Sequence, residues 1–151
     1  EFVKYYQNSI DCFISNKSLY NYYNIKNFSN NEIISVGYEN IKCLLTPGHH
    51  YDSACFWIES SNLLFTGDTM FVGRTGRTVN KGSKIIDLYN SIYNILLLLP
   101  KKTLILSGHD YGFQKFITID DNIKKSNFFR CKNLEEFVLV MKNYEKTRKM
   151  K

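Results

Sequence analysis

Three β-prone apolar segments of the chain each lead into a short loop motif that carries one side chain able to bind a metal ion. The motifs are Thr46-Pro47-Gly48-His49, Phe65-Thr66-Gly67-Asp68-Thr69 and Ser107-Gly108-His109-Asp110-Tyr111. In α/β sheets, ligand-binding side chains collect just beyond strand ends. A sheet that aligned these ends would bring together His49, Asp68 and His109. Two imidazoles and a carboxylate suit a hard or borderline cation, so the pattern predicts a metal site.

Each of these residues also has a purely structural interpretation. His49 could satisfy a backbone carbonyl in its loop, and Asp68 could form an Asx turn or cap a helix, as aspartate commonly does. Asp110 could orient the imidazole of His109, although neighbours in sequence need not touch. The three motifs lie far apart in the chain, so only the fold can bring them to a shared site.

Length and composition are those of an ordinary globular protein. We expect residues 1–151 to form a single domain with a buried core. The net charge of +6 is concentrated near the C-terminus, without a zinc-finger, RNA-binding or basic-heptad pattern, so no nucleic-acid partner is expected. The longest apolar run, residues 95–99, is far too short to span a membrane. The 4 cysteines lack Cys-x-x-Cys spacing and favour a reducing intracellular compartment, the mitochondrion or the cytoplasm.

Hydrophobic patterning predicts an α/β fold. We expect strands over residues 10–14, 32–36, 40–45, 54–59, 63–65 and 103–106, with the end of a helix over residues 1–7. Helical spacing of apolar residues predicts a helix over residues 84–99, with Ser83 as its N-cap and Pro100 at its end. A last helix begins at Asn133, with Glu136 as a capping-box partner. The strands are apolar enough for burial on both faces, so helices should cover the sheet.

A glycine-rich loop, Gly73-Arg74-Thr75-Gly76-Arg77-Thr78, follows the second motif. It lacks the Gly-Lys-Ser/Thr end of a Walker A loop and does not read Gly-x-Gly-x-x-Gly, so it is not expected to cradle a nucleotide. We interpret it as an active-site loop that carries an arginine toward an anionic group. The alternative is a flexible surface loop.

The order and wording of these motifs resemble the glyoxalase II-like branch of the metallo-β-lactamase superfamily. Within that branch the chain is most similar to glutathione persulfide dioxygenases. The similarity rests on Gly76-Arg77-Thr78, on His109-Asp110-Tyr111-Gly112-Phe113, and on the short ending that contains Leu134-Glu135-Glu136-Phe137-Val138. The resemblance implies an αβ/βα sandwich. The family's first motif, His-x-His-x-Asp-His, does not occur in this sequence, so we expect the C-terminal portion of a longer enzyme.

The resemblance also implies roles for individual residues. His49 and Asp68 would bind Fe(II), and His109 would lie beside the iron or complete a second metal position. Arg77 would bind the anionic glutathione-derived substrate, and Asp110 and Tyr111 would serve as catalytic residues that support the site. Two positions depart from the usual pattern, His50 after the ligand histidine and Val79 after Gly-Arg-Thr.

Three functions follow as alternatives. The leading hypothesis is an Fe(II) persulfide dioxygenase that converts glutathione persulfide to sulfite and glutathione. The second is a hydroxyacylglutathione hydrolase with one or two zinc ions, where two metals would generate the attacking hydroxide. The third is a degenerate, non-catalytic scaffold. Without the first motif, we expect these 151 residues alone to be inactive and to expose apolar sheet surface that favours self-association.

Overall fold

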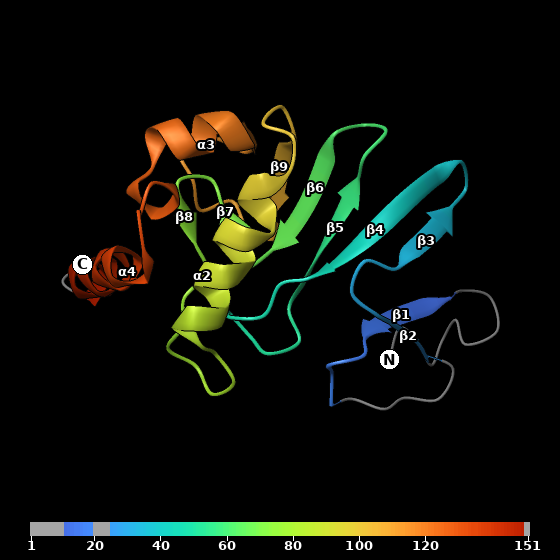
Figure 1. Ribbon diagram of the computed structural model, residues 1–151, viewed down its shortest axis with the longest axis horizontal. Helices are drawn as coiled ribbons and strands as arrows, with labels where there is room; N and C mark the ends of the chain where they lie inside the picture. Colours follow the sequence, from blue (N-terminus) through green and yellow to red (C-terminus); the bar gives the residue numbers. More distant parts are fainter. Residues whose placement is uncertain (1–10, 20–24, 150–151) are drawn as a thin grey trace.

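The computed structural model describes residues 11–19 and 25–149. Its centre is a six-stranded sheet with the order β10-β9-β6-β5-β4-β3 (Figure 1). Neighbouring strands are antiparallel except for β6 and β9, which run parallel. The strands are β3 (Ile33–Val36), β4 (Glu39–Leu45), β5 (Ala54–Ile58), β6 (Leu63–Gly67), β9 (Leu104–Ser107) and β10 (Ile117–Thr118).

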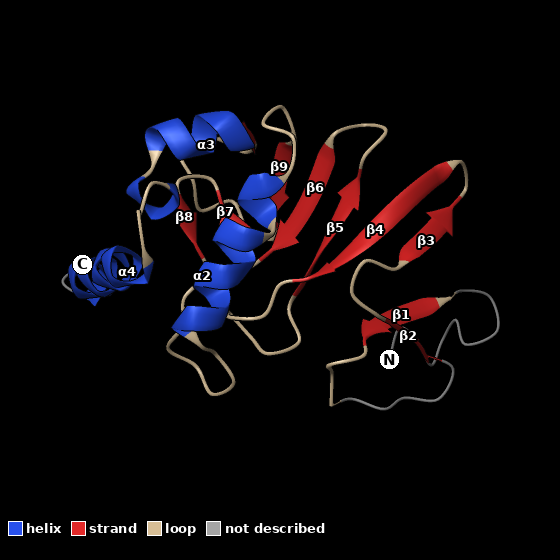
Figure 2. Ribbon diagram, viewed as in Figure 1, coloured by secondary structure: helices blue, strands red, loops and turns tan. Residues whose placement is uncertain are grey.

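Shorter strands and the helices lie around this sheet (Figure 2). The antiparallel pair β7 (Met70–Phe71) and β8 (Arg74–Thr75) follows the second motif, and the parallel pair β1 (Cys12–Ser15) and β2 (Ile25–Phe28) lies near the β3 end of the sheet. The helices gather toward the β9 end. They are α2 (Ile85–Asn94), η1 (Leu96–Leu98), α3 (Ile119–Lys125), η2 (Asn127–Phe129) and α4 (Leu134–Lys149).

One face of the sheet forms the core with these helices. Leu64 of β6 and Ile105 of β9 are fully buried, and so are Leu88 and Ile92, one turn apart on α2. Phe137 of α4 is also fully buried in this cluster. Burial of a large apolar side chain contributes about 1.5–3 kcal/mol, so this shared core fixes α2 and α4 relative to the strand ends.

The last helix begins as its capping pattern predicted. The Asn133 side-chain oxygen accepts a hydrogen bond from the Glu136 N–H at 2.9 Å. The Glu136 carboxylate in turn accepts from the Lys132 N–H at 2.9 Å. Met141 is buried one turn beyond Phe137, so this side of α4 faces the core.

Other expectations about the elements were wrong. Ser83 does not cap α2, because its hydroxyl donates to the Asn80 carbonyl at 2.6 Å and Lys84 is the N-cap without a side-chain bond. The helix expected to reach residue 99 ends at Asn94 and continues only as the 3₁₀ turn η1. β2 was not among the expected strands. The helix end expected over residues 1–7 lies outside the described residues.

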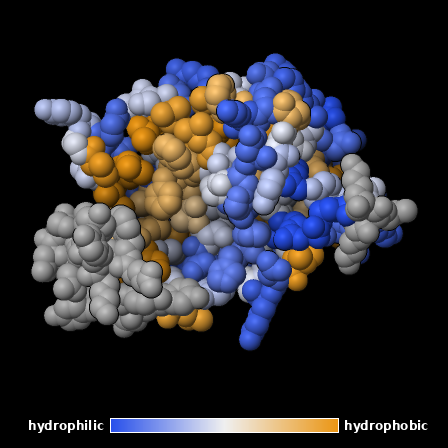
Figure 3. All heavy atoms as spheres, turned by 180° about the vertical axis from the view of Figure 1, so that it is seen from behind, coloured by the Kyte–Doolittle hydropathy of each residue, from blue (hydrophilic) through white to orange (hydrophobic). Residues whose placement is uncertain are grey.

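The opposite face of the sheet carries apolar side chains that the helices leave uncovered. Phe56 of β5 pairs directly with Phe65 of β6, and Phe65 is 42% exposed. Figure 3 shows apolar surface on this side of the molecule. The β1–β2 pair covers it only in part, with Phe28 edge-on to Phe56 at 5.6 Å between ring centroids. The expectation that helices cover the sheet was therefore wrong for this face, whereas the expectation of exposed apolar sheet surface is confirmed.

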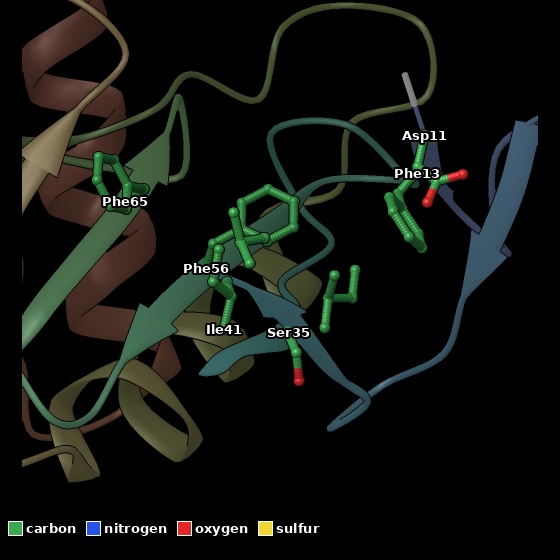
Figure 4. Close-up of a pocket in the computed structure, with 8 residues that line it drawn as sticks. Asp11, Phe13, Ser35, Ile41, Phe56 and Phe65 are labelled. Carbon is green, nitrogen blue, oxygen red and sulfur yellow. The ribbon is translucent and has the colours of Figure 1, made fainter. Parts of the chain in front are cut away.

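A hollow of about 650 Å³ lies on the same face (Figure 4). Its lining combines sheet residues with the β1 region and is mostly apolar: Asp11, Phe13, Ile34, Ser35, Val36, Ile41, Phe56 and Phe65. An exposed apolar area of this kind favours association.

We expect the 151-residue chain to bind the dye ANS and to self-associate through this face. Phe65→Ser should lower ANS fluorescence and the average mass in analytical ultracentrifugation, because it removes an exposed ring from the face. Leu98→Ser is the matched control, since Leu98 is 74% exposed in η1, next to α2. Equal changes in the two variants would show that self-association does not occur through the sheet face that carries Phe65.

Candidate metal centre

The strand directions bring the three loop motifs to one edge of the sheet. β4 and β6 are both antiparallel to β5 and therefore run in the same direction, and β9 is parallel to β6. The loops after these three strands consequently leave the sheet at the same end. The first loop also reaches the start of α2, where the Lys84 N–H donates to the Gly48 carbonyl at 2.9 Å.

Asp68 lies between the two histidines of the other motifs. Its Oδ2 is 3.7 Å from His49 Nε2, and its Oδ1 is 3.4 Å from His109 Nε2. The exposed fractions of the side chains are 22% for His49, 35% for Asp68 and 50% for His109. The fold thus gathers the three residues that the motifs singled out, and each carboxylate oxygen faces a different imidazole.

His49 is oriented by the glycine-rich loop. Its Nδ1 lies 2.9 Å from the Arg77 carbonyl oxygen. A carbonyl can only accept, so Nδ1 is the donor in this contact, and Nε2 is the ring nitrogen that faces Asp68. This arrangement, in which the other ring nitrogen is held by an acceptor, is typical of metal-binding histidines.

Two glycines allow this close packing. Gly48 has φ +139°, and a Cβ there would lie 2.2 Å from the Leu88 backbone nitrogen. A Cβ on Gly76 would lie 1.9 Å from the Asp68 carbonyl oxygen and 3.0 Å from His49 Nδ1. Any side chain at either position would displace the loop that carries His49 or Asp68.

A buried cluster of hydroxyls and one thiol joins the loops beneath the site. Thr46 Oγ1 lies 3.3 Å from Cys55 Sγ and 3.1 Å from Thr69 Oγ1. The Cys55 thiol donates to the Thr66 carbonyl at 3.6 Å, and the Thr66 hydroxyl donates to the Met70 carbonyl at 2.6 Å. The cluster therefore ties the end of β4 to β5 and to the turn that carries Asp68.

Burial raises the pKa of the Cys55 thiol from its ordinary value of 9.0 to about 11. Cys55 is therefore a neutral thiol at physiological pH. Metal binding and nucleophilic attack both require the thiolate, so Cys55 serves the scaffold beneath the site.

A pocket of about 70 Å³ opens at this edge. Its lining comes from the loop after β4, from the segment that follows β6 and includes β7 and β8, and from the loop after β9. The lining residues are His49, Asp68, Phe71, Arg74, Thr75, Gly76, Arg77 and Tyr111. Arg77 thus lies at the pocket, as its loop suggested, and its backbone also orients His49. The geometry fits a small anionic group beside the histidine–carboxylate cluster.

Arg74 is a residue of this pocket that the sequence analysis passed over. Its guanidinium lies over the rings of Phe71, Tyr111 and Tyr144, at 5.3, 4.6 and 5.4 Å from their centroids, and donates to the Tyr144 hydroxyl. Each such cation–π contact contributes roughly 0.5–2 kcal/mol. Burial lowers the pKa of the Arg74 guanidinium, although arginine stays charged at neutral pH. The glycine-rich loop was the only signal in the sequence that pointed to it.

The other expected residues lie at the margin of the site. Tyr111 stacks on His109 at 4.8 Å between ring centroids. Asp110 is exposed, and within residues 11–19 and 25–149 it has no hydrogen bond or ion pair to His109. His50 pairs with Asp52, away from the His49–Asp68 pair.

The donor set suits a metal ion but is incomplete by itself. Two imidazoles and a carboxylate are ligands of iron and zinc sites. Among the described residues, no three histidine, cysteine or acidic side chains converge closely enough to hold an ion. His49 and Asp68 therefore fit as part of a ligand set that needs further donors.

The fold places two histidines and an aspartate close together on strand-end loops at one edge of an α/β sheet. The chain belongs to the metallo-beta-lactamase superfamily, whose family description matches residues 27–109. This match confirms the family that the motifs indicated.

Relatives and solved structures agree with that assignment. The chain is 37% identical over 92 residues to a hydroxyacylglutathione hydrolase of Dictyostelium discoideum, covering 57% of this chain and 34% of the relative. It is 33% identical over 119 residues to a probable hydroxyacylglutathione hydrolase of Schizosaccharomyces pombe, covering 77% and 43%. The structure of ETHE1 from Myxococcus xanthus superimposes with a TM-score of 0.80 at 27% identity, covering 93% of this chain and 61% of that one.

The chain thus spans about a third to three fifths of the length of these proteins. The structural match confirms the expected metallo-β-lactamase fold. In the part of the chain that the structure describes, no helix has the length and apolar character needed to cross a bilayer.

We expect Thr46→Val to lower the free energy of unfolding by about 1–3 kcal/mol, because it leaves the buried polar atoms of Cys55 and Thr69 without their shared partner. Urea unfolding measures this change. Thr147→Val is the control. Thr147 is exposed on α4, and among the described residues its hydroxyl donates only to the Tyr144 carbonyl. Equal stability losses would show that the cluster does not hold the loops.

The raised pKa of Cys55 predicts a loss of stability in alkali. Below pH 9 the thiol is protonated in both states, so its contribution is fully present. As the pH rises from about 9 toward 11, the unfolded thiol ionises while the native one does not, and stability falls by up to about 1.4 kcal/mol per pH unit. Urea unfolding at pH 8 and pH 10.5 should show a larger loss for the wild type than for Cys55→Ala. A loss of the same size in both proteins would contradict the assignment.

Proposed function

We propose that this chain carries part of the active site of an Fe(II) persulfide dioxygenase, which oxidises glutathione persulfide to sulfite and glutathione. The observation that carries the proposal is the His49–Asp68 pair, with His49 held by the Arg77 carbonyl and with the Arg77 side chain at the same pocket. The Gly76-Arg77-Thr78 wording of that loop resembles the dioxygenases. Oxygen is the oxidant, and water supplies the third oxygen atom of sulfite.

The two histidines differ in a way that supports a single iron. His49 has the Nδ1 contact that is typical of a ligand. His109 is half exposed, and within the described ranges it has no hydrogen-bond partner for Nδ1, only the contacts with Asp68, Phe71 and Tyr111. Preorganisation therefore favours His49 and Asp68 as the ligands and leaves His109 beside them.

The pocket residues have separate tasks in this proposal. A bound iron would supply open positions for sulfur and oxygen. The Arg77 guanidinium would pair with a carboxylate of the glutathione-derived substrate. Tyr111 would form one wall of the pocket, and Asp110, which is exposed and precedes Tyr111 in the chain, would support the site.

Completion of the site requires donors other than these two. Since no group of three ligating side chains converges among the described residues, we propose that the activity belongs to a longer protein that contains this chain. We expect the 151 residues alone to bind metal weakly and to show no turnover. The free cysteines are consistent with a reducing compartment, the mitochondrion or the cytoplasm.

The second candidate is a hydroxyacylglutathione hydrolase with one or two zinc ions. It is favoured by the names of the relatives from Dictyostelium discoideum and Schizosaccharomyces pombe. It is also favoured by Asp68, whose two oxygens face the two histidines and could serve two metal positions. A non-catalytic scaffold is the remaining alternative.

The iron-loaded full-length protein should consume oxygen when glutathione persulfide is added. Asp68→Asn should lower kcat/KM on the order of 100-fold or more, because it weakens a metal ligand. Asp120→Asn is the matched control, because among the described residues the Asp120 side chain pairs only with Lys124 on α3. Its activity should equal that of the wild type.

The outcomes separate the three functions. Hydrolysis of S-lactoylglutathione without oxygen uptake would replace the dioxygenase by the hydrolase. Neither reaction, in a protein with stoichiometric metal, would leave the scaffold as the function of this chain.

A further inference from the structure

A continuous stack of side chains connects the C-terminal helix to the candidate metal centre. It runs from Tyr144 of α4 to Arg74 of β8, then to Tyr111 and to His109. The Arg74 Cζ atom is 4.6 Å from the Tyr111 ring centroid, and the Tyr111 and His109 rings are 4.8 Å apart with 26° between their planes. Phe71 flanks the stack, 5.3 Å from Arg74 and 5.5 Å from the Tyr111 ring.

The outer part of the stack is held by few other contacts. Tyr111 is 58% exposed and the His109 side chain 50% exposed. Among the described residues neither ring has a hydrogen bond. Besides Tyr111, His109 contacts Asp68 at 3.4 Å and the Phe71 ring at 6.3 Å between centroids. Stacking is therefore the main interaction that sets the orientation of both rings.

The inner part of the stack is firmly anchored. Arg74 lies in β8, paired with β7, and its side chain donates to the Tyr144 hydroxyl. Tyr144 packs edge-on against Phe128 at 5.5 Å between centroids. Its helix α4 is fixed by buried Phe137. Arg74 thus links α4 to the two exposed rings of the site.

Three ring faces surround the Arg74 charge, and the Glu145 carboxylate adds a favourable electrostatic contribution from outside ion-pair distance. No carboxylate within residues 11–19 and 25–149 forms an ion pair with Arg74. A planar guanidinium stacks on aromatic faces in a way that an ammonium does not reproduce. The position therefore requires both the charge and the shape of arginine.

We propose that Arg74 is a positioning residue that orients His109 through Tyr111 and so couples α4 to the metal centre. The importance of His109 orientation for chemistry rests on the proposed function. The coupling itself does not, because every contact in it is made by the chain alone.

The test uses NMR of the metal-free chain. A ring stacked on Tyr111 has imidazole proton resonances displaced upfield, and His109→Ala assigns them. Arg74→Leu should abolish this displacement, and Arg74→Lys should restore only part of it. Arg130→Leu is the matched control. Arg130 is exposed, and among the described residues its side chain bonds only to Asn127. This variant should leave the His109 resonances unchanged.

The result that would overturn the proposal is a folded Arg74→Leu variant whose His109 resonances match the wild type. If Arg74→Leu does not fold, Tyr144→Phe takes its place, because it keeps the ring and removes only the oxygen that Arg74 binds. It should shift the same resonances in the same direction by a smaller amount, and unchanged resonances would again overturn the proposal.

The resonances are read without metal and without turnover, so absence of oxygen uptake would overturn the proposed function without touching this one. Unshifted resonances would overturn the role of Arg74 alone.

Discussion

The buried contact between Thr46, Cys55 and Thr69 is the interaction on which the candidate centre depends. It connects two loops that leave different strands, and it does so with short polar side chains that fit a fully enclosed space. Unpaired polar atoms there would be costly, so the cluster permits essentially one arrangement of the loops. The positions of His49 and Asp68 depend on that arrangement, which therefore sets the distance between His49 Nε2 and Asp68 Oδ2.

The two sides of the centre are held by different physics. On one side, backbone and glycine packing fix His49 to within a hydrogen bond of Arg77. On the other, stacked side chains from distant segments hold His109. Hydrogen bonds specify direction more strictly than stacking does. The orientation of His49 is therefore the more strictly fixed of the two, as a metal ligand requires, and that of His109 is more adjustable.

The sequence revealed the parts of the fold that have local signatures. Apolar runs that end in Gly-His or Gly-Asp predicted the strand ends, and the Asn133–Glu136 pattern predicted the start of α4. The hairpin of β7 and β8 has strands of two residues each, too short for any periodicity. The role of Arg74 was hidden because its partners, Tyr111 and Tyr144, become neighbours only after folding. The uncovered sheet face similarly depends on which side the helices pack.

Anomalous diffraction from crystals of the full-length, iron-loaded protein would show which residues bind the iron. We expect one iron per chain, bonded to His49 Nε2 and to the Asp68 carboxylate, with His109 close by but not bonded. Two metal ions bridged by Asp68, with His109 bound to the second, would contradict the mononuclear dioxygenase and favour the hydrolase. Iron at a site that includes neither His49 nor Asp68 would contradict the proposal that these residues bind the metal.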